Sequence, residues 1–97
     1  MPFPFTDLTG NKVRPALIIS KKNPGNDIVV LFVTTKFRGK NAVIILPDVG
    51  NGLKVKSAIV CSKIATLDTA TILGELGMLS ALMQKKVDAT LRTVLGL

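Results

Sequence analysis

Short apolar runs separated by turn residues dominate the first two thirds of the chain. The runs are rich in Val and Ile and too short for helices, and the first three are bounded by residues that favour turns, such as Pro, Gly and Asn. Runs of this length and composition are typical of β-strands buried on both faces. The pattern predicts strands at residues 13–20, 27–34, 42–46 and 57–62, and a short strand at 71–76.

The hydrophobic pattern changes to a helical period at Ser80. From there apolar residues recur every three or four positions, with polar residues on the other faces. Ser80 is suited to cap the helix N-terminus, and Gly96 follows the last periodic residue, where a helix commonly ends. We interpret the stripe as core rather than as a cofactor site; its members are Met83, Val87, Leu91, Val94 and Leu95.

Five or six short strands followed by one helix predict the fold class. The expected fold is mainly β with a C-terminal helix, in the form of a small, strongly bent β-barrel capped by that helix. The 97 residues suit one domain that spans residues 1–97. Without Trp or Tyr and with four Phe, the core must consist chiefly of aliphatic side chains.

Composition indicates a cytoplasmic protein. No apolar run approaches the length of a membrane span, and no basic segment followed by an apolar stretch marks an export signal. Cys61 is the one cysteine, which fits a reducing compartment and excludes an internal disulfide. Its apolar surroundings in the sequence predict a buried strand thiol.

Positive charge is concentrated in the first part of the chain. Residues 1–63 hold ten Lys or Arg and three Asp, whereas residues 64–97 hold three charges of each sign, so the net charge of +7 lies in the first part. Basic surfaces of this kind attract phosphate backbones. A surface that only keeps the protein soluble is the alternative.

The absence of histidine limits the chemistry available to this chain. It excludes catalysis by a histidine acid or base and removes the commonest zinc ligand. With a single cysteine, no metal cluster is expected. Any reaction must therefore use Arg, Lys, hydroxyl groups or a carboxylate.

Arg14 stands at the mouth of the first buried run, after a Gly-Asn turn, and Val33-Thr34-Thr35-Lys36 ends the next run. Because a charged side chain is costly to hide at a strand end, Arg14 either points to solvent or binds an anion. The two segments together predict part of a phosphate-binding site. Alternatively, Arg14 pairs with a carboxylate such as Asp7, the threonines are ordinary strand residues, and the loop lysines are simply solvated.

The chain resembles the MazF/PemK (Kid) family, the toxins of bacterial toxin–antitoxin pairs, over nearly its whole length. The resemblance is densest at residues 2–10 (Pro-Phe-Pro-Phe-Thr-Asp-Leu-Thr-Gly), 14–20 (Arg-Pro-Ala-Leu-Ile-Ile-Ser), 33–36, 63–68 (Lys-Ile-Ala-Thr-Leu-Asp) and 76–80. It implies an SH3-like barrel that forms a homodimer and cuts single-stranded RNA without a metal or other cofactor. It also implies an acidic antitoxin that neutralises the enzyme and forms a DNA-binding complex with it.

The resemblance assigns roles to particular residues. It places the main catalytic arginine at Arg14 and a catalytic hydroxyl at Thr34. Attack of the 2′-OH builds charge on the phosphate oxygens, which a guanidinium fork and a hydroxyl donor suit well. The products would be a cyclic phosphate and a 5′-hydroxyl end. The residues expected to bind RNA around the scissile phosphate are Lys12, Thr35, Lys36, Arg38 and Lys40.

The sequence departs from the family pattern in two places. Most of the strand that usually precedes Pro-Phe-Pro-Phe is missing, so we expect a truncated first strand and an unpaired barrel edge. Val60 and Ser62 stand where some members have an Arg and an Asp, which leaves the general base unassigned; Asp7, in the expected loop before Arg14, is a weak candidate. The alternatives are a weak or inactive homologue that keeps antitoxin and dimer binding, and an SH3-like module that binds nucleic acid or protein.

Overall fold

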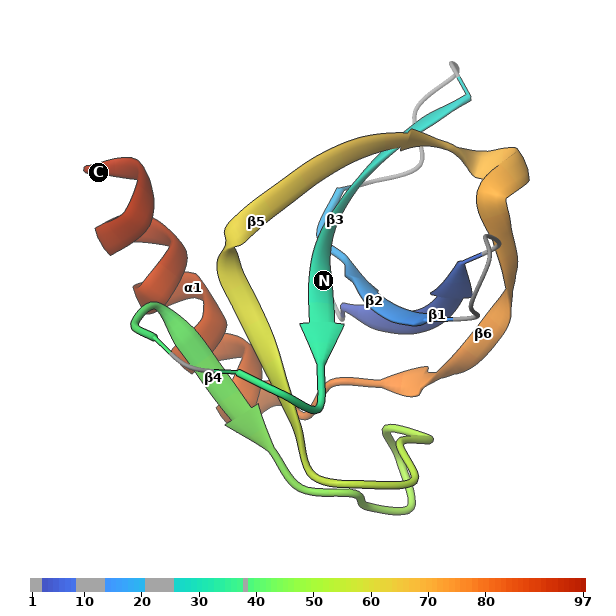
Figure 1. The fold of residues 1–97 in the computed structure, drawn as a ribbon, viewed down its shortest axis with the longest axis horizontal. Coiled ribbons are helices and arrows are strands. Elements are labelled where there is room, and N and C mark those ends of the chain that lie inside the picture. Colours follow the sequence, from blue (N-terminus) through green and yellow to red (C-terminus); the bar gives the residue numbers. More distant parts are fainter. Residues whose placement is uncertain (1–2, 9–13, 21–25, 38) are drawn as a thin grey trace.

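Strands are the main secondary structure of this computed structural model, which describes residues 3–8, 14–20, 26–37 and 39–97. Six strands form one antiparallel sheet in the order β4-β5-β3-β2-β1-β6 (Figure 1). The short 3-10 turn η1 (Thr69–Thr71) joins β5 to β6, and the helix α1 (Ala81–Leu95) follows. The strands are β1 (Pro4–Leu8), β2 (Arg14–Ile18), β3 (Asp27–Thr34), β4 (Ala42–Ile45), β5 (Ser57–Asp68) and β6 (Ile72–Met78).

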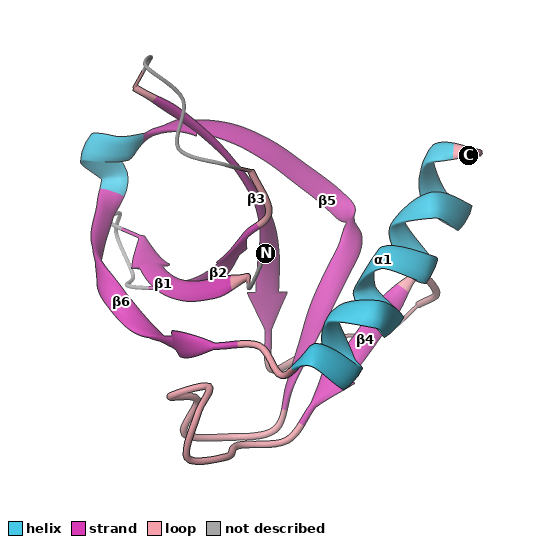
Figure 2. Ribbon diagram, turned by 180° about the vertical axis from the view of Figure 1, so that it is seen from behind, coloured by secondary structure: helices cyan, strands magenta, loops and turns pink. Residues whose placement is uncertain are grey.

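The sheet is strongly curved, but it does not close. Strands β1, β2, β3, β6 and the second half of β5 curve around one side, while α1 lies outside the curve beside β4 and β5 (Figures 1 and 2). The edge strands β4 and β6 are not paired with each other. The predicted mainly β fold with a C-terminal helix is therefore confirmed, as an open curved sheet.

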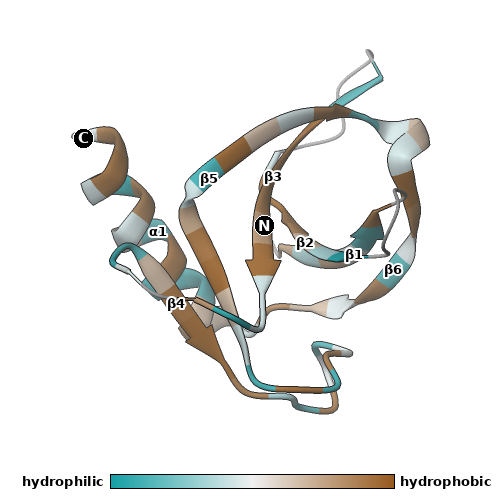
Figure 3. Ribbon diagram, viewed as in Figure 1, coloured by the Kyte–Doolittle hydropathy of each residue, from teal (hydrophilic) through white to brown (hydrophobic). Residues whose placement is uncertain are grey.

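Both faces of the central strands are buried, as the apolar runs predict. Leu17 and Leu31 belong to a cluster that faces α1 and includes Val87 of the helix, whereas Ala16 and Val30 belong to a second cluster inside the curve. Side chains alternate between the faces along each strand, so β2 and β3 supply both clusters. In Figure 3 hydrophobic residues run along β3, β4 and the part of β5 next to β4.

The helix forms as its sequence predicts. The Ser80 hydroxyl accepts a hydrogen bond from the Met83 amide at 3.3 Å, and Gly96 ends the helix in the left-handed conformation with a φ of 73°. Val87 is fully buried, and Met83, Leu91 and Val94 pack against the same core. The prediction was wrong for Leu95, which is 55% exposed.

Two strands differ from their predictions. No strand was expected at residues 4–8, because Pro, Thr and Asp weaken the apolar pattern there, yet β1 pairs with both β2 and β6. The strand predicted at 57–62 continues to Asp68. A register shift places Val60 opposite Phe32 but Ile64 opposite Leu31, so the intervening residues form a bulge. Exposed polar residues in this bulge interrupt the apolar run and hid the rest of β5 from the sequence pattern.

The turn between β4 and β5 is docked on the edge strand β6. The Met78 amide donates to the carbonyl of Gly50 at 2.8 Å. Asn51 is 1% exposed; its side-chain oxygen accepts from Asp48 and Leu53 amides, and its side-chain nitrogen donates to Leu46. These contacts tie the β4–β5 part of the sheet to its far edge. Within the described residues, no helix is long and apolar enough to span a membrane.

Cys61 is fully buried, as predicted, and burial raises the pKa of its thiol from an ordinary value of 9.0 to about 11. Because the thiolate is the nucleophile, we expect Ellman's reagent to react very slowly with the native protein at about pH 8 and quickly after unfolding. The unfolded thiol loses its proton first as the pH rises. The contribution of the neutral Cys61 thiol to the free energy of unfolding is fully present below pH 9 and is therefore lost as the pH rises from 9 to about 11. Equally fast reaction of native and unfolded protein would contradict this burial.

Candidate phosphate-binding site

Three chain segments meet where the ends of three neighbouring inner strands lie side by side. Ala16 of β2 pairs with Phe32 of β3, and extending this register by two residues places Arg14 opposite Thr34. On the other side of β3, Thr34 pairs with Ala58 of β5. The start of β2, the end of β3 and the start of β5 therefore lie side by side, although they are far apart in the sequence.

A pocket of about 430 Å³ opens at these strand ends. It brings together four of the residues predicted from the sequence, namely Arg14, Thr34, Thr35 and Lys36. Lys40 is exposed and does not line the pocket. Lys12 and Arg38 lie outside the described residues. The complete lining comprises Arg14, Pro15, Val33, Thr34, Thr35, Lys36 and Ser57.

The Thr34 hydroxyl is held by the turn that follows β3. Its oxygen accepts a hydrogen bond from the Lys36 amide at 3.2 Å, and the hydroxyl lies 3.4 Å from the Lys36 carbonyl oxygen, to which it donates weakly. Thr34 is half-buried on a strand that is fixed by two neighbours. Its hydroxyl proton can thus be redirected to a bound phosphate oxygen with little loss of side-chain entropy.

The pocket carries positive charge without a balancing carboxylate. Arg14 and Lys36 are exposed, and no Asp or Glu stands among the described lining residues. Asp7 lies in β1 opposite Pro15, rather than in the loop expected from the sequence, and does not line the pocket. Among the described residues no hydrogen bond or ion pair engages the side chain of Arg14. A cationic fork beside a hydroxyl donor is suited to hold a phosphodiester.

The sequence analysis missed Ser57, which lines the pocket from the start of β5. Ser57 is 4% exposed, and its hydroxyl donates to the Val55 carbonyl at 2.9 Å. The signal was its place at the beginning of a predicted strand, but only the pairing of β3 with β5 brings it to Thr34. Val60 and Ser62 do not line the pocket, so no acid or base is added from that part of β5.

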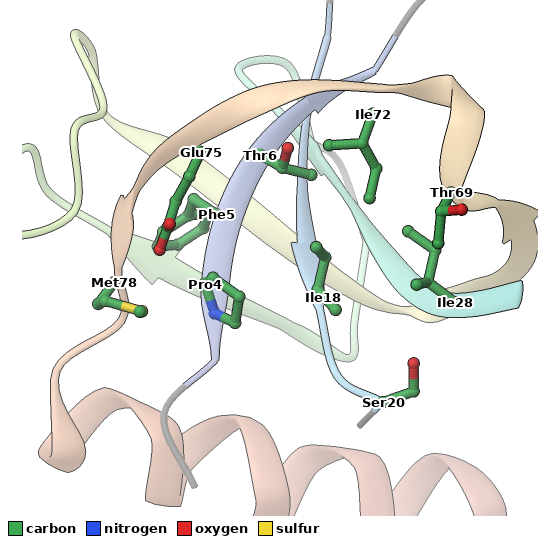
Figure 4. A pocket seen from close by; sticks show the side chains of 10 residues that line it. All are labelled: Pro4, Phe5, Thr6, Ile18, Ser20, Ile28, Thr69, Ile72, Glu75 and Met78. Carbon is green, nitrogen blue, oxygen red and sulfur yellow. The ribbon is translucent and has the colours of Figure 1, made fainter. Parts of the chain in front are cut away.

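A larger pocket of about 560 Å³ lies in the curve of the sheet (Figure 4). Side chains from β1, β2, β3 and β6 surround it, and many of them are apolar, such as Phe5, Ile18 and Ile72. Glu75 is the one charged side chain among its described lining residues. It provides no cation for a phosphate, so the smaller pocket that contains Arg14 is the candidate site. In the described part of the chain, no group of three His, Cys, Asp or Glu is arranged to hold a metal ion.

Comparison with known proteins identifies the family. Residues 3–95 match the model of the PemK-like, MazF-like toxins of type II toxin–antitoxin systems. The chain belongs to this family. The predicted family resemblance is thereby confirmed, whereas the roles of the individual pocket residues stay predictions. A search of curated protein sequences gives no significant match.

Solved MazF toxins share the fold. The Mycobacterium tuberculosis toxin MazF-mt6 is 23% identical, with a TM-score of 0.84 over 97% of each chain. A mycobacterial endoribonuclease in complex with its cognate antitoxin is 25% identical, with a TM-score of 0.78 over 99% of this chain and 92% of that one. A chain of the MazE–MazF complex from Deinococcus radiodurans is 21% identical, with a TM-score of 0.80 over 97% of this chain and 92% of that one.

Proposed function

We propose that this MazF-like toxin is an endoribonuclease that cuts single-stranded RNA at the Arg14 pocket by metal-independent attack of the 2′-OH. The observation that carries the proposal is the meeting of Arg14, Thr34 and Lys36 in one pocket whose described lining has no carboxylate. An arginine and a lysine without a carboxylate beside them in the described lining, next to a fixed hydroxyl, suit a phosphodiester better than an uncharged ligand.

The proposed chemistry uses the pocket residues as donors to the phosphate. The substrate 2′-oxygen attacks the adjacent phosphorus, the bond to the 5′-oxygen breaks, and a cyclic phosphate and a 5′-hydroxyl result. Arg14 stabilises the charge that grows on the non-bridging oxygens, and the Thr34 hydroxyl supplies a second donor. Fixed donors aimed at developing charge contribute a few kcal/mol each, or about a hundred- to thousand-fold in rate.

A weak or inactive toxin homologue is the second candidate function. The described pocket lining offers no group that takes a proton at neutral pH, because it consists of Arg, Lys, hydroxyl and apolar residues. Such a protein would keep antitoxin and dimer binding but turn over RNA slowly. Cleavage and antitoxin binding must therefore be measured separately.

The proposed partners are an acidic antitoxin and a second copy of this chain. The net charge of +7 suits an acidic peptide that folds on binding and competes with RNA. For the homodimer, the described structure offers the edge strand β4 and the neighbouring helix, where Ile44, Leu46 and Leu82 are 48%, 65% and 67% exposed. Burying such apolar side chains favours association.

The proposed function is tested with the purified protein and a long single-stranded RNA in EDTA, beside the same sequence as a duplex. We expect discrete cuts in the single strand only, with 5′-hydroxyl ends. A folded protein that binds its antitoxin but leaves the RNA intact would contradict the enzyme and support the inactive homologue.

A further inference from the structure

We infer that Lys54 and Lys56, which precede β5, form a second phosphate-binding element beside the Arg14 pocket. The inference rests on the proposed function and extends it, because it assigns residues that hold the RNA next to the cleaved bond. Both lysines are exposed, and neither lines the pocket itself. They belong to a short turn of residues 54–56.

The position of the 54–56 turn follows from the sheet register. Thr34 pairs with Ala58, so the residues after Thr34 leave the sheet beside the residues before Ala58. Lys36 and Ser57 both line the pocket, and Lys56 immediately precedes Ser57 in the chain, so Lys56 lies beside the pocket that contains Lys36. Like charges gathered near this end of the strands repel one another. A bound polyanion removes that repulsion.

The 54–56 turn is held at both ends, so the backbone that carries its lysines is fixed. At one end Leu53 is buried in the core, and its amide donates to the Asn51 side chain at 2.9 Å. At the other end the buried Ser57 hydroxyl donates back to the Val55 carbonyl at 2.9 Å. Binding a phosphate here orders little backbone, which lowers the entropic cost of binding.

The turn also offers an apolar contact between its two charges. Val55 is 54% exposed and lies between the two lysines in the sequence. Single-stranded RNA presents phosphates and unstacked bases together, and proteins that bind it combine charge with apolar contacts. The segment therefore fits one nucleotide beside the scissile phosphate, with the lysines on phosphate oxygens and Val55 against the base.

The experiment measures the affinity of the intact protein for a single-stranded oligonucleotide with 2′-O-methyl riboses, which cannot be cut, over a range of salt concentrations. For Lys54→Ala/Lys56→Ala we expect weaker binding and a salt slope that is smaller by about 1.4, because each lost phosphate contact on a single strand lowers it by about 0.7. The control Lys63→Ala/Lys85→Ala removes the same charge from exposed sites outside the pocket lining and should bind nearly as the parent does.

Kinetics separate this role from that of Arg14. The 54–56 lysines bind substrate and transition state alike, so their loss should raise KM and leave kcat nearly unchanged. If the parent protein cuts RNA but the double variant Lys54→Ala/Lys56→Ala has the same salt slope as the parent, the inference is overturned and the proposed function stands. An equal loss of affinity in the control variant has the same meaning. No binding or cutting by the parent protein would overturn both. Weaker binding of poly-glutamate with unchanged RNA affinity would assign the lysines to a protein partner and also overturn it.

Discussion

Arg14→Ala is expected to lower the rate constant for RNA cleavage about a hundred- to thousand-fold, the effect of removing one fixed donor from developing charge. Arg14 is exposed and packs in neither core cluster, so the free energy of unfolding should change by less than about 0.5 kcal/mol. Single-turnover cleavage of a labelled RNA measures the first quantity and urea denaturation the second.

Two further variants control for charge. Arg14→Lys keeps the positive charge but loses the planar fork, so it should recover only a small part of the rate. Arg92→Ala removes the same charge from an exposed position on α1 and should cut as the parent does. If Arg14→Ala cuts at the parental rate, Arg14 does not stabilise the transition state and the assignment of this pocket fails.

Gly52→Ala is expected to destabilise the fold by about 3 kcal/mol or more. Gly52 has a φ of 71°, where a side chain is strained, and an added Cβ would overlap the backbone carbonyl of Leu76 in β6. The backbone of β6 cannot move away as a flexible side chain can, so the turn between β4 and β5 would lose its contact with this edge strand. Urea denaturation at equilibrium measures the loss.

Gly74→Ala is the matched control for Gly52→Ala, because it lies in the strand on which the turn docks. An added Cβ there meets no atom within 4 Å, and Gly74 does not have a positive φ. We expect its free energy of unfolding to change by less than about 1 kcal/mol. Parental stability of Gly52→Ala would show that the turn and β6 are not in contact.

The helix and the central strands could be predicted from the sequence because their signals are local. Ser80 and Gly96 mark the helix ends, and the apolar runs around Leu17 and Leu31 are long enough to indicate burial on both faces. Strand β1 carries Pro4, Thr6 and Asp7, and its pairing with β2 and β6 depends on contacts distant in the sequence. Such pairing overrides weak local propensity.

The candidate site was predicted only in part, for the same reason. Arg14 and Thr34 could be assigned to one site from the sequence because Arg14 begins one apolar run and Thr34 ends the next. The resemblance to the family pointed to the same residues. Ser57 and the lysines before it come together with them only through the register of β3 and β5. The bulge that displaces this register has no distinctive sequence signal beyond the polar residues Ser62 and Lys63.

The central claim is tested most directly with two oligonucleotides that contain a mapped cleavage site, in EDTA. One is all RNA, and the other has a single 2′-deoxyribose on the 5′ side of the scissile phosphate. We predict that the protein cuts the first, releasing a cyclic phosphate and a 5′-hydroxyl, and leaves the second intact while binding both about equally. Equal cutting of the two would show that the 2′-oxygen is not the nucleophile and would contradict the proposed reaction.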